Sequence, residues 1–169
     1  YRGLINKILI VSPGHLKYQW LREMKEKFHE HFKIADRDMM DSSWGQNIFD
    51  EEHQLITSID FAKQEDVLSS LRESHWDLTI VDEAHKMSAY QYGDKINKTS
   101  RYVFGETASE ISNYLLFLTA TPHRGDDENF RLFLDLLEPG FFADTKMLSD
   151  SIKARENPLF IRRLKEDMK

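Results

Sequence analysis

Short apolar runs alternate with amphipathic segments along the 169 residues of this chain. A continuous apolar run predicts a strand that is covered on both faces, as in a parallel sheet. Apolar residues that recur at intervals of three or four predict helices between these strands. The predicted strands are residues 8–11, 54–58, 78–81 and 115–118, with a weaker one at 32–34, and the predicted helices are 16–28, 67–71 and 130–137. This alternation indicates an α/β fold with a mostly parallel sheet.

Two intervals have no clear period. Residues 36–50 are polar and mixed, and we interpret them as a loop. Residues 86–110 contain several helix breakers, so we expect an insertion with some helix there. Three acidic residues precede the last predicted helix, where the helix dipole favours negative charge. We interpret them as capping residues rather than metal ligands; they are Asp126, Asp127 and Glu128.

Composition excludes several classes of protein. With 40% hydrophobic and 12% aromatic residues, the chain is not mainly disordered. The net charge of -6 argues against nucleic-acid binding by bulk charge, but not against a local contact with phosphates. The absence of cysteine excludes disulfides, thiolate metal sites and a cysteine nucleophile. No apolar run approaches the ~20 residues that span a bilayer, and no signal peptide is visible, so we expect no membrane association and a cytoplasmic location.

The length fits one domain. The first residue, Tyr1, is not an initiator methionine, and a predicted strand begins almost at once. The charged stretch from Leu159 ends the sequence at Lys169. We therefore expect a piece of a longer chain.

Four predicted strands end in small, polar or acidic residues. The carboxyl ends of parallel strands meet at one edge of the sheet, where ligands bind in open α/β folds. Two carboxylates there, Asp82 and Glu83, can divide two tasks, one holding a divalent cation and one handling the proton of an attacking water. Alone, this pair is equally typical of a solvated acidic turn. A phosphate-handling ATPase explains all four exits together; they are Ser12-Pro13-Gly14-His15, Thr57-Ser58, Asp82-Glu83-Ala84-His85 and Thr119-Ala120-Thr121-Pro122.

In this order, the exits resemble motifs of superfamily-two helicase and translocase ATPases. Asp82-Glu83-Ala84-His85 is similar to motif II, and Thr119-Ala120-Thr121-Pro122 is similar to motif III. Residues 8–13 together with Gln19-Trp20 resemble motif Ia. Residues 55–58 resemble the next motif that contacts nucleic acid. Residues 121–126, 132–142 and 160–167 are similar to Swi/Snf-type helicase-related ATPases, and among them to the RapA-like branch of bacteria and archaea. The resemblance covers nearly the whole chain. It implies a RecA-like fold of the P-loop NTPase type, with a mostly parallel sheet flanked by helices.

The resemblance also implies roles for single residues in an enzyme that uses ATP and Mg²⁺. Asp82 would hold Mg²⁺ through water, and Glu83 would orient or deprotonate the water that attacks the γ-phosphate. Coupling between the nucleotide and the nucleic acid is implied for His85, Thr119 and Thr121. Contacts with the backbone of double-stranded DNA are implied for Ser12, Pro13, Gly14, His15, Thr57 and Ser58.

One family motif is absent from the 169 residues. The Gly-rich phosphate loop ends in Gly-Lys-Thr or Gly-Lys-Ser, and neither tripeptide occurs here. The family places this loop upstream of motif Ia, so we expect it before Tyr1, and we expect the second RecA-like lobe with its arginine after Lys169. Residues 1–169 would then be a partial N-terminal lobe, truncated before the phosphate loop and containing motifs Ia to III and the start of the Swi/Snf-specific region. We expect this polypeptide alone to have no meaningful ATPase activity.

Three function classes remain. An ATP-driven translocase lobe acting on double-stranded DNA is favoured, because a non-hydrolysing lobe has no chemical reason to keep Asp82, Glu83 and His85 together. The alternative is a degenerate RecA-like scaffold or nucleic-acid-binding module. A conventional strand-separating helicase is the third class. The residues leave open whether the track is DNA or RNA, and which complex uses the motor.

Overall fold

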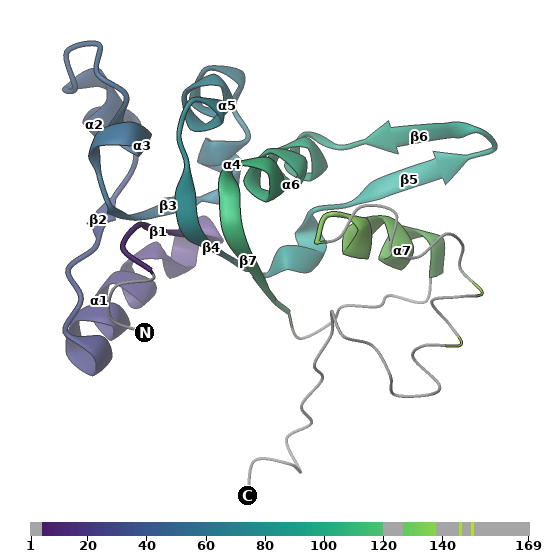
Figure 1. Cartoon of the computed structure of the whole chain (residues 1–169), viewed down its shortest axis with the longest axis horizontal. Coiled ribbons are helices and arrows are strands. Elements are labelled where there is room, and N and C mark those ends of the chain that lie inside the picture. Colours follow the sequence, from purple (N-terminus) through teal and green to yellow (C-terminus); the bar gives the residue numbers. More distant parts are fainter. Residues whose placement is uncertain (1–4, 120–126, 138–145, 147–149, 151–169) are drawn as a thin grey trace, which may run out of the picture.

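A five-stranded parallel sheet forms the centre of the molecule (Figure 1). The computed structural model describes residues 5–119, 127–137, 146 and 150. The strand order is β2-β3-β1-β4-β7, and every neighbouring pair is parallel. The strands are β1 (Ile8–Ser12), β2 (Lys33–Ile34), β3 (Gln54–Ser58), β4 (Trp76–Asp82) and β7 (Ser112–Leu118). The predicted α/β class and all five predicted strands are therefore confirmed.

Helices cover the sheet on both faces and explain why the strands are apolar without interruption. On β1, Leu9 and Val11 belong to one buried cluster, and Ile10 between them belongs to another on the opposite face. All three side chains are fully buried. The cluster around Ile10 packs against α1 (Lys17–Phe28). The other cluster includes residues of α3 (Ile48–Glu51), α4 (Ile59–Ala62), α5 (Glu65–Arg72) and α6 (Ser100–Ile111).

The loop expected at residues 36–50 was wrong in part. This interval contains α2 (Arg37–Asp41) and the start of α3. Each of these helices has an N-cap side chain: Asp36 accepts the Met39 N–H at 3.0 Å, and Asn47 accepts the Phe49 N–H at 3.0 Å. One helical turn is too short to produce a visible hydrophobic period, so the caps were the only local signal.

The insertion at residues 86–110 contains the predicted helix and a hairpin that the sequence did not reveal. The hairpin joins β5 (Ala89–Tyr92) to antiparallel β6 (Lys95–Lys98), with Gly93 at φ 61° in the turn, and it extends away from the sheet (Figure 1). All four residues of β6 are exposed, so no buried face sets an alternating pattern. The helix of the insertion is α6, which continues directly into β7.

The last predicted helix is confirmed within the described residues as α7 (Asp127–Asp135). Asp127 and Glu128 lie in its first turn rather than before it, and the Glu128 carboxylate accepts from Arg131 Nε at 2.9 Å. Asp126 lies outside the described residues, so the capping interpretation stays a prediction, and the stop expected at Pro139-Gly140 lies outside them as well. The Tyr102 hydroxyl of α6 donates to the Leu132 carbonyl at 2.9 Å, and burial raises the pKa of Tyr102 to about 12. This bond ties α7 to the body of the fold.

Among the described residues, no helix is both long and apolar enough to cross a bilayer. The cytoplasmic location stays a prediction.

A salt bridge between α4 and α6 predicts a pH effect on stability. Arg101 Nη2 lies 2.8 Å from Asp60 Oδ1, and this guanidinium holds the pKa of Asp60 below its ordinary value of 3.8. A lowered pKa means that the pair stabilises the fold above the unfolded-state pKa and that this contribution is lost as the pH falls through the folded-state pKa. We expect Arg101→Gln to lower the melting temperature only slightly at about pH 6, because the pair is partly solvent-exposed. The difference in melting temperature from wild type should shrink towards about pH 3, because protonation of Asp60 removes the ion pair.

The matched control is Arg22→Gln on the exposed side of α1. It should give the same difference from wild type at both pH values. A difference for Arg101→Gln that grows as the pH falls would contradict the assignment.

Candidate functional site

The four predicted strand exits lie at one edge of the sheet. Strands β3, β1, β4 and β7 are consecutive neighbours and run in the same direction. The register places Ser12 beside Ser58, and Asp82 beside Leu118. Residues from distant parts of the sequence therefore converge, as the parallel-sheet argument requires.

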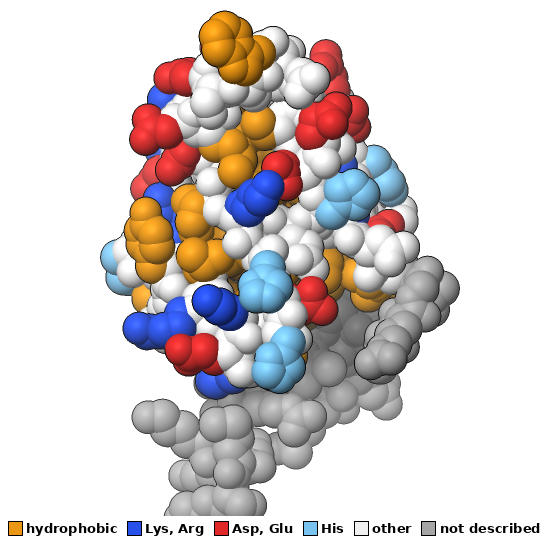
Figure 2. Space-filling model, turned by 90° about the vertical axis from the view of Figure 1, so that its left-hand side faces the viewer, with side chains coloured by type: hydrophobic (Ala, Val, Ile, Leu, Met, Phe, Trp, Pro, Cys, Tyr) orange, Lys and Arg blue, Asp and Glu red, His pale blue; other side chains and the backbone are white. Residues whose placement is uncertain are grey.

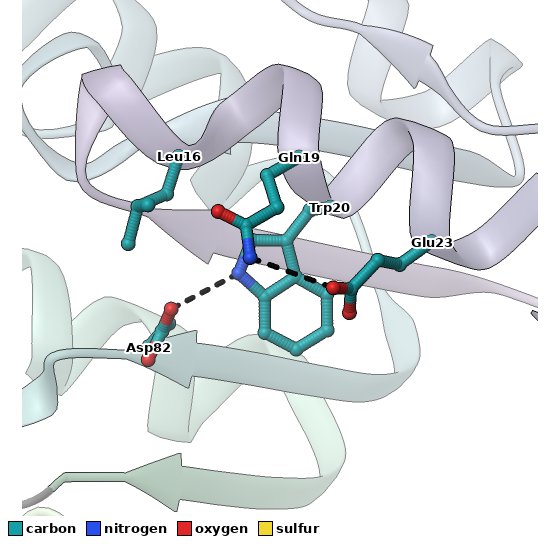
Figure 3. A pocket seen from close by; sticks show the side chains of 5 residues that line it. All are labelled: Leu16, Gln19, Trp20, Glu23 and Asp82. Carbon is teal, nitrogen blue, oxygen red and sulfur yellow. Dashed lines mark hydrogen bonds between the residues drawn. The ribbon is translucent and has the colours of Figure 1, made fainter.

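Asp82, the last residue of β4, has a hydrogen bond to each carboxylate oxygen. The Trp20 indole Nε1 donates to Oδ2 at 3.0 Å, and the Glu83 backbone N–H donates to Oδ1 at 2.9 Å. Figure 3 shows the Trp20 ring pointing from α1 down to Asp82 on the sheet. Beside this contact lies a pocket of about 130 Å³. The pocket is lined by Leu16, Gln19, Trp20, Glu23 and Asp82.

Glu83 has a left-handed backbone conformation, with φ 53° and ψ 39°. Such values are uncommon for residues other than glycine and cost on the order of 1–3 kcal/mol. The bond from its N–H to Asp82 supports this conformation, and the 3-10 turn η2 (Ala84–Lys86) follows at once. The turn brings Glu83 Oε2 to 3.5 Å from His85 Nε2. The strained turn thus directs the second carboxylate towards the histidine.

His85 connects the end of β4 to the end of β7. Its Nδ1 lies 2.8 Å from Thr119 Oγ1, and its side chain is only 7% exposed. The structure therefore joins the two stretches that resemble motifs II and III by a side-chain hydrogen bond. Thr121, the other predicted coupling residue, lies outside the described residues.

The carboxylate of Asp82 suits a magnesium ion that is held through water. A carboxylate has about four lone-pair positions, and the two hydrogen bonds occupy two of them. Mg²⁺ usually keeps several waters and binds one or two carboxylates together with substrate phosphates. Within the part of the chain that the structure describes, no group of three or more ligand-type side chains could form a protein cage for a metal. The residues present thus fit the predicted Mg²⁺, with Asp82 as its holder.

The residues predicted to contact nucleic acid divide into two groups. Ser12 and Thr57 are fully buried, and their hydroxyls donate to the carbonyls of Pro13 at 3.1 Å and Ala35 at 2.9 Å. The backbone contact implied for Ser12 and the hydroxyl contact implied for Thr57 are therefore not available in this structure, because both residues are fully buried. Pro13 is buried as well, but Gly14 and His15 are exposed.

Ser58 remains near the surface and has a structural task of its own. Its side chain is half-buried, and its Oγ accepts the Phe61 N–H at 3.1 Å as the N-cap of α4. A hydroxyl that accepts this bond still has its proton to donate. Ser58, Gly14 and His15 are thus the predicted contacts that a nucleic acid can reach.

Sequence reasoning did not predict the contact between Trp20 and Asp82. Trp20 is one of the apolar residues of the predicted helix 16–28, and its ring does pack on the cluster around Ile10. The side chain is only half-buried, however, and its N–H ends on Asp82. The one available signal was that a partly buried indole N–H needs an acceptor, which does not identify a residue 62 positions away.

Charge is unevenly distributed on the face seen in Figure 2. Acidic side chains gather in the upper half, whereas lysine, arginine and histidine side chains are more frequent in the lower half. The described residues on this face thus form no continuous basic surface. This agrees with the net charge of -6 and favours local contacts over binding by bulk charge.

Comparison with known proteins identifies the family. The family model described as "SNF2-related domain" matches residues 2–169. The chain belongs to the SNF2-related family. It is 32% identical over 159 residues to the RNA polymerase-associated protein RapA of Sodalis glossinidius (strain morsitans), an alignment that covers 88% of the chain. It is 37% identical over 145 residues to RapA of Vibrio atlanticus (strain LGP32), covering 84% of the chain. This SNF2-related chain spans about 15% of the length of each of these relatives.

Solved structures support the fold. The SWI2/SNF2 ATPase core of Sulfolobus solfataricus in complex with dsDNA matches with a TM-score of 0.61 and 17% identity, over 92% of this chain and 31% of that one. The Hef helicase domain of Pyrococcus furiosus matches with a TM-score of 0.55 and 16% identity, over 80% of this chain and 28% of that one. The RecA-like arrangement predicted for the sheet is confirmed by these matches.

Proposed function

We propose that this SNF2-related chain is part of an ATP-driven motor that moves along double-stranded DNA. In this proposal, residues 1–169 contribute motifs Ia to III and the start of the Swi/Snf-specific region to an N-terminal RecA-like lobe. The observation that carries the proposal is the hydrogen-bonded convergence of Asp82, Glu83, His85 and Thr119 at one sheet edge. A solvated acidic turn requires neither the strained Glu83 backbone nor a buried histidine between two strand ends.

Each of the converging residues has a distinct task in ATP hydrolysis. Asp82 holds Mg²⁺ through water, and Mg²⁺ when bound neutralises charge on the phosphate oxygens. Glu83 orients the attacking water and accepts its proton, for which its partly exposed carboxylate is accessible. His85 contacts Glu83 through Nε2 and Thr119 through Nδ1. A movement of Glu83 at the γ-phosphate would therefore alter the position of the end of β7.

The nucleic-acid contacts that we propose are Gly14, His15 and Ser58. Gly14 and His15 belong to the exposed turn η1 (Gly14–Leu16) after β1, and Ser58 ends the neighbouring β3. Neutral backbone and hydroxyl donors such as these suit the sugar–phosphate backbone rather than base edges. A motor that follows the backbone without reading sequence needs this kind of contact. The Sulfolobus SWI2/SNF2 ATPase core was solved in complex with dsDNA, which supports DNA as the track.

The phosphate loop and the second lobe would come from other parts of the full-length protein. An open apolar area beside Asp82 supports such a further element. Tyr114 and Leu116 of β7 are 63% and 46% exposed, and Leu116 pairs with Ile80 on the face that α1 covers only in part. Large exposed apolar side chains that are grouped on a sheet commonly mark an interface.

ATP hydrolysis by the full-length protein tests the proposal. We expect Mg²⁺-dependent phosphate release that increases when double-stranded DNA is added. The scaffold alternative predicts binding of nucleotide or DNA without phosphate release, and that result would reject the motor. Displacement of a triplex-forming strand without unwinding of a duplex would separate a translocase from a strand-separating helicase. Steady ATP turnover by the isolated 169-residue polypeptide would contradict the proposed need for the phosphate loop and the second lobe.

The bond between His85 and Thr119 yields a separate prediction. Thr119→Val keeps the shape of the side chain but removes the oxygen that lies 2.8 Å from His85 Nδ1. We expect the stimulation of ATP hydrolysis by double-stranded DNA to fall by roughly 5-fold or more, the lower range of allosteric coupling, with the DNA-free rate changed by less than about 2-fold. Phosphate release with and without DNA measures both values.

Thr107→Val on α6 is the matched control, since it makes the same change at a threonine that does not bond to His85. It should leave the stimulation unchanged. Equal loss of the DNA-free and DNA-stimulated rates in Thr119→Val would show that Thr119 serves the chemistry or the fold rather than coupling.

A further inference from the structure

Trp20 is the contact through which α1 reaches the proposed metal site. Its indole Nε1 lies 3.0 Å from Asp82 Oδ2, and its ring packs on the cluster that contains Ile10 and Ile56. An indole has two side-chain torsions and a single N–H, so packing of the ring also fixes the direction of the donor. The position of one carboxylate oxygen is thus determined by a rigid group from another element.

The acceptor of this hydrogen bond differs from the one that a buried tryptophan N–H commonly uses. The fully buried Trp76 donates its N–H to the Ser74 hydroxyl at 2.9 Å, a neutral neighbour two positions away. Trp20 instead donates to a carboxylate oxygen at a strand exit 62 positions away. Hydrogen bonds to charged acceptors are roughly twice as strong as neutral ones. This bond therefore stabilises one orientation of the Asp82 carboxylate, the group that the proposed chemistry uses.

The pocket beside the bond gives Asp82 room to turn. Its volume of about 130 Å³ exceeds the space of a single water, and Gln19 and Glu23 also line it (Figure 3). Those two side chains are bonded to each other at 3.4 Å. Among the described residues, the Trp20 N–H holds Oδ2 and the Glu83 N–H holds Oδ1 of this carboxylate.

We propose that Trp20 is a positioning residue that holds Asp82 in the orientation needed to bind Mg²⁺ through water. This rests on the proposed function, since it assumes that Asp82 is the metal-holding carboxylate. Because α1 follows directly from the exposed turn at Gly14 and His15, the same helix joins the proposed DNA contact to the metal site. Trp20 acts through Asp82 and does not itself touch the reacting atoms.

Trp20→Phe in the full-length protein tests the role, because phenylalanine keeps most of the apolar ring and removes the N–H. We expect the Mg²⁺ concentration for half-maximal ATP hydrolysis to rise by about 3- to 10-fold, in keeping with the loss of a hydrogen bond to a charged group. The rate at saturating Mg²⁺ should stay within about 3-fold of wild type, because the metal then holds the carboxylate. A purely structural residue would lower the rate at every Mg²⁺ concentration, and that result would overturn the proposal.

Trp44→Phe is the matched control, since the Trp44 side chain is 96% exposed. It should leave the Mg²⁺ dependence unchanged. It also removes one of the three tryptophans, so Trp20 and Trp76 alone remain to fluoresce.

Tryptophan fluorescence gives a readout that needs neither catalysis nor a Trp20 variant. The measurement uses the full-length protein with Trp44→Phe and with any tryptophans outside residues 1–169 replaced. Addition of Mg²⁺ and a non-hydrolysable ATP analogue should shift the wavelength of the tryptophan emission. The further change Asp82→Asn should abolish that shift. Emission that does not respond, or that responds equally with Asp82→Asn, would overturn the proposal even if Trp20→Phe fails to fold.

The two proposals fail in different ways. If wild-type protein releases no phosphate but the fluorescence shift depends on Asp82, the motor is rejected and the positioning role stands. If wild type hydrolyses ATP and Trp20→Phe has the Mg²⁺ dependence of wild type, the motor stands and the positioning role is rejected.

Discussion

Glu83→Gln in the full-length protein is expected to lower the rate of ATP hydrolysis by about 10²- to 10⁴-fold, the range that a general base contributes. The amide has nearly the shape of the carboxylate and can occupy the same place, 3.5 Å from His85 Nε2. It cannot accept the proton of the attacking water. Binding of Mg²⁺ and nucleotide should persist, since Asp82 and its two hydrogen bonds are unchanged.

Single-turnover phosphate release and binding of a fluorescent ATP analogue measure the two quantities. Glu110→Gln on the exposed side of α6 is the matched control and should leave both unchanged. Because the change at Glu83 affects the chemical step, DNA should not restore the rate. Loss of nucleotide binding in parallel with hydrolysis would show that Glu83 supports the turn rather than the reaction.

The backbone of Glu83 makes this prediction sensitive to the local fold. The residue has a φ of 53°, a conformation that asparagine and aspartate tolerate better than glutamate or glutamine. Gln replaces Glu without changing this cost, so the loss of rate is not confounded by strain. Glu83→Gly, by contrast, would relieve the strain and remove the carboxylate together, and it is a poorer test.

The elements that sequence reasoning predicted are those whose pattern arises from burial on both faces. Ile10 and its neighbours on β1 are fully buried, so the apolar run itself indicated a central strand. The exit of Asp82 from β4 followed from the same reasoning. The exposed hairpin strand β6 and the one-turn helix α3 were missed, because neither is long enough or buried enough to have a period.

The site shows a similar division. Residue types and spacing indicated which stretches converge, and the convergence of Asp82 with Thr119 through His85 agrees with that expectation. Local spacing does not show which way a side chain turns. Thr57 Oγ1 donates to the Ala35 carbonyl, and Trp20 Nε1 donates to Asp82. Both are long-range contacts, which depend on the packing of α1 and β2 against the sheet rather than on neighbouring residues.

The largest effect on stability is expected for Trp76→Ala, at about 3–5 kcal/mol, as for other fully buried aromatic residues. Trp76 begins β4 and is completely buried. The Lys7 ammonium lies 4.6 Å from the centre of its ring, and Asp77 next to it accepts the Lys7 N–H at 2.9 Å. Removing the indole leaves a cavity at the point where β4 meets the start of β1.

Amide hydrogen exchange in the full-length protein measures this loss. Protection of the β1 and β4 amides should fall by roughly 100- to 4,000-fold, the equivalent of 3–5 kcal/mol. Trp76→Phe should fall between wild type and Trp76→Ala, because it keeps a six-membered ring but loses the five-membered ring of the indole and the bond to Ser74. Trp44→Ala, at an exposed site, should change protection by no more than the ±0.5 kcal/mol usual for surface residues.

Hydrogen exchange also distinguishes a loss of folding stability from a loss of catalysis at the opposite end of β4. Trp76 and Asp82 are the two ends of one strand, so weakening the first also releases the second. Trp76→Ala should therefore lower ATP hydrolysis together with protection, whereas Glu83→Gln should lower hydrolysis with protection unchanged. If Trp76→Ala kept full protection in β4 and still lost activity, the core would not be what positions Asp82, and its orientation would depend on Trp20 and the Glu83 turn alone.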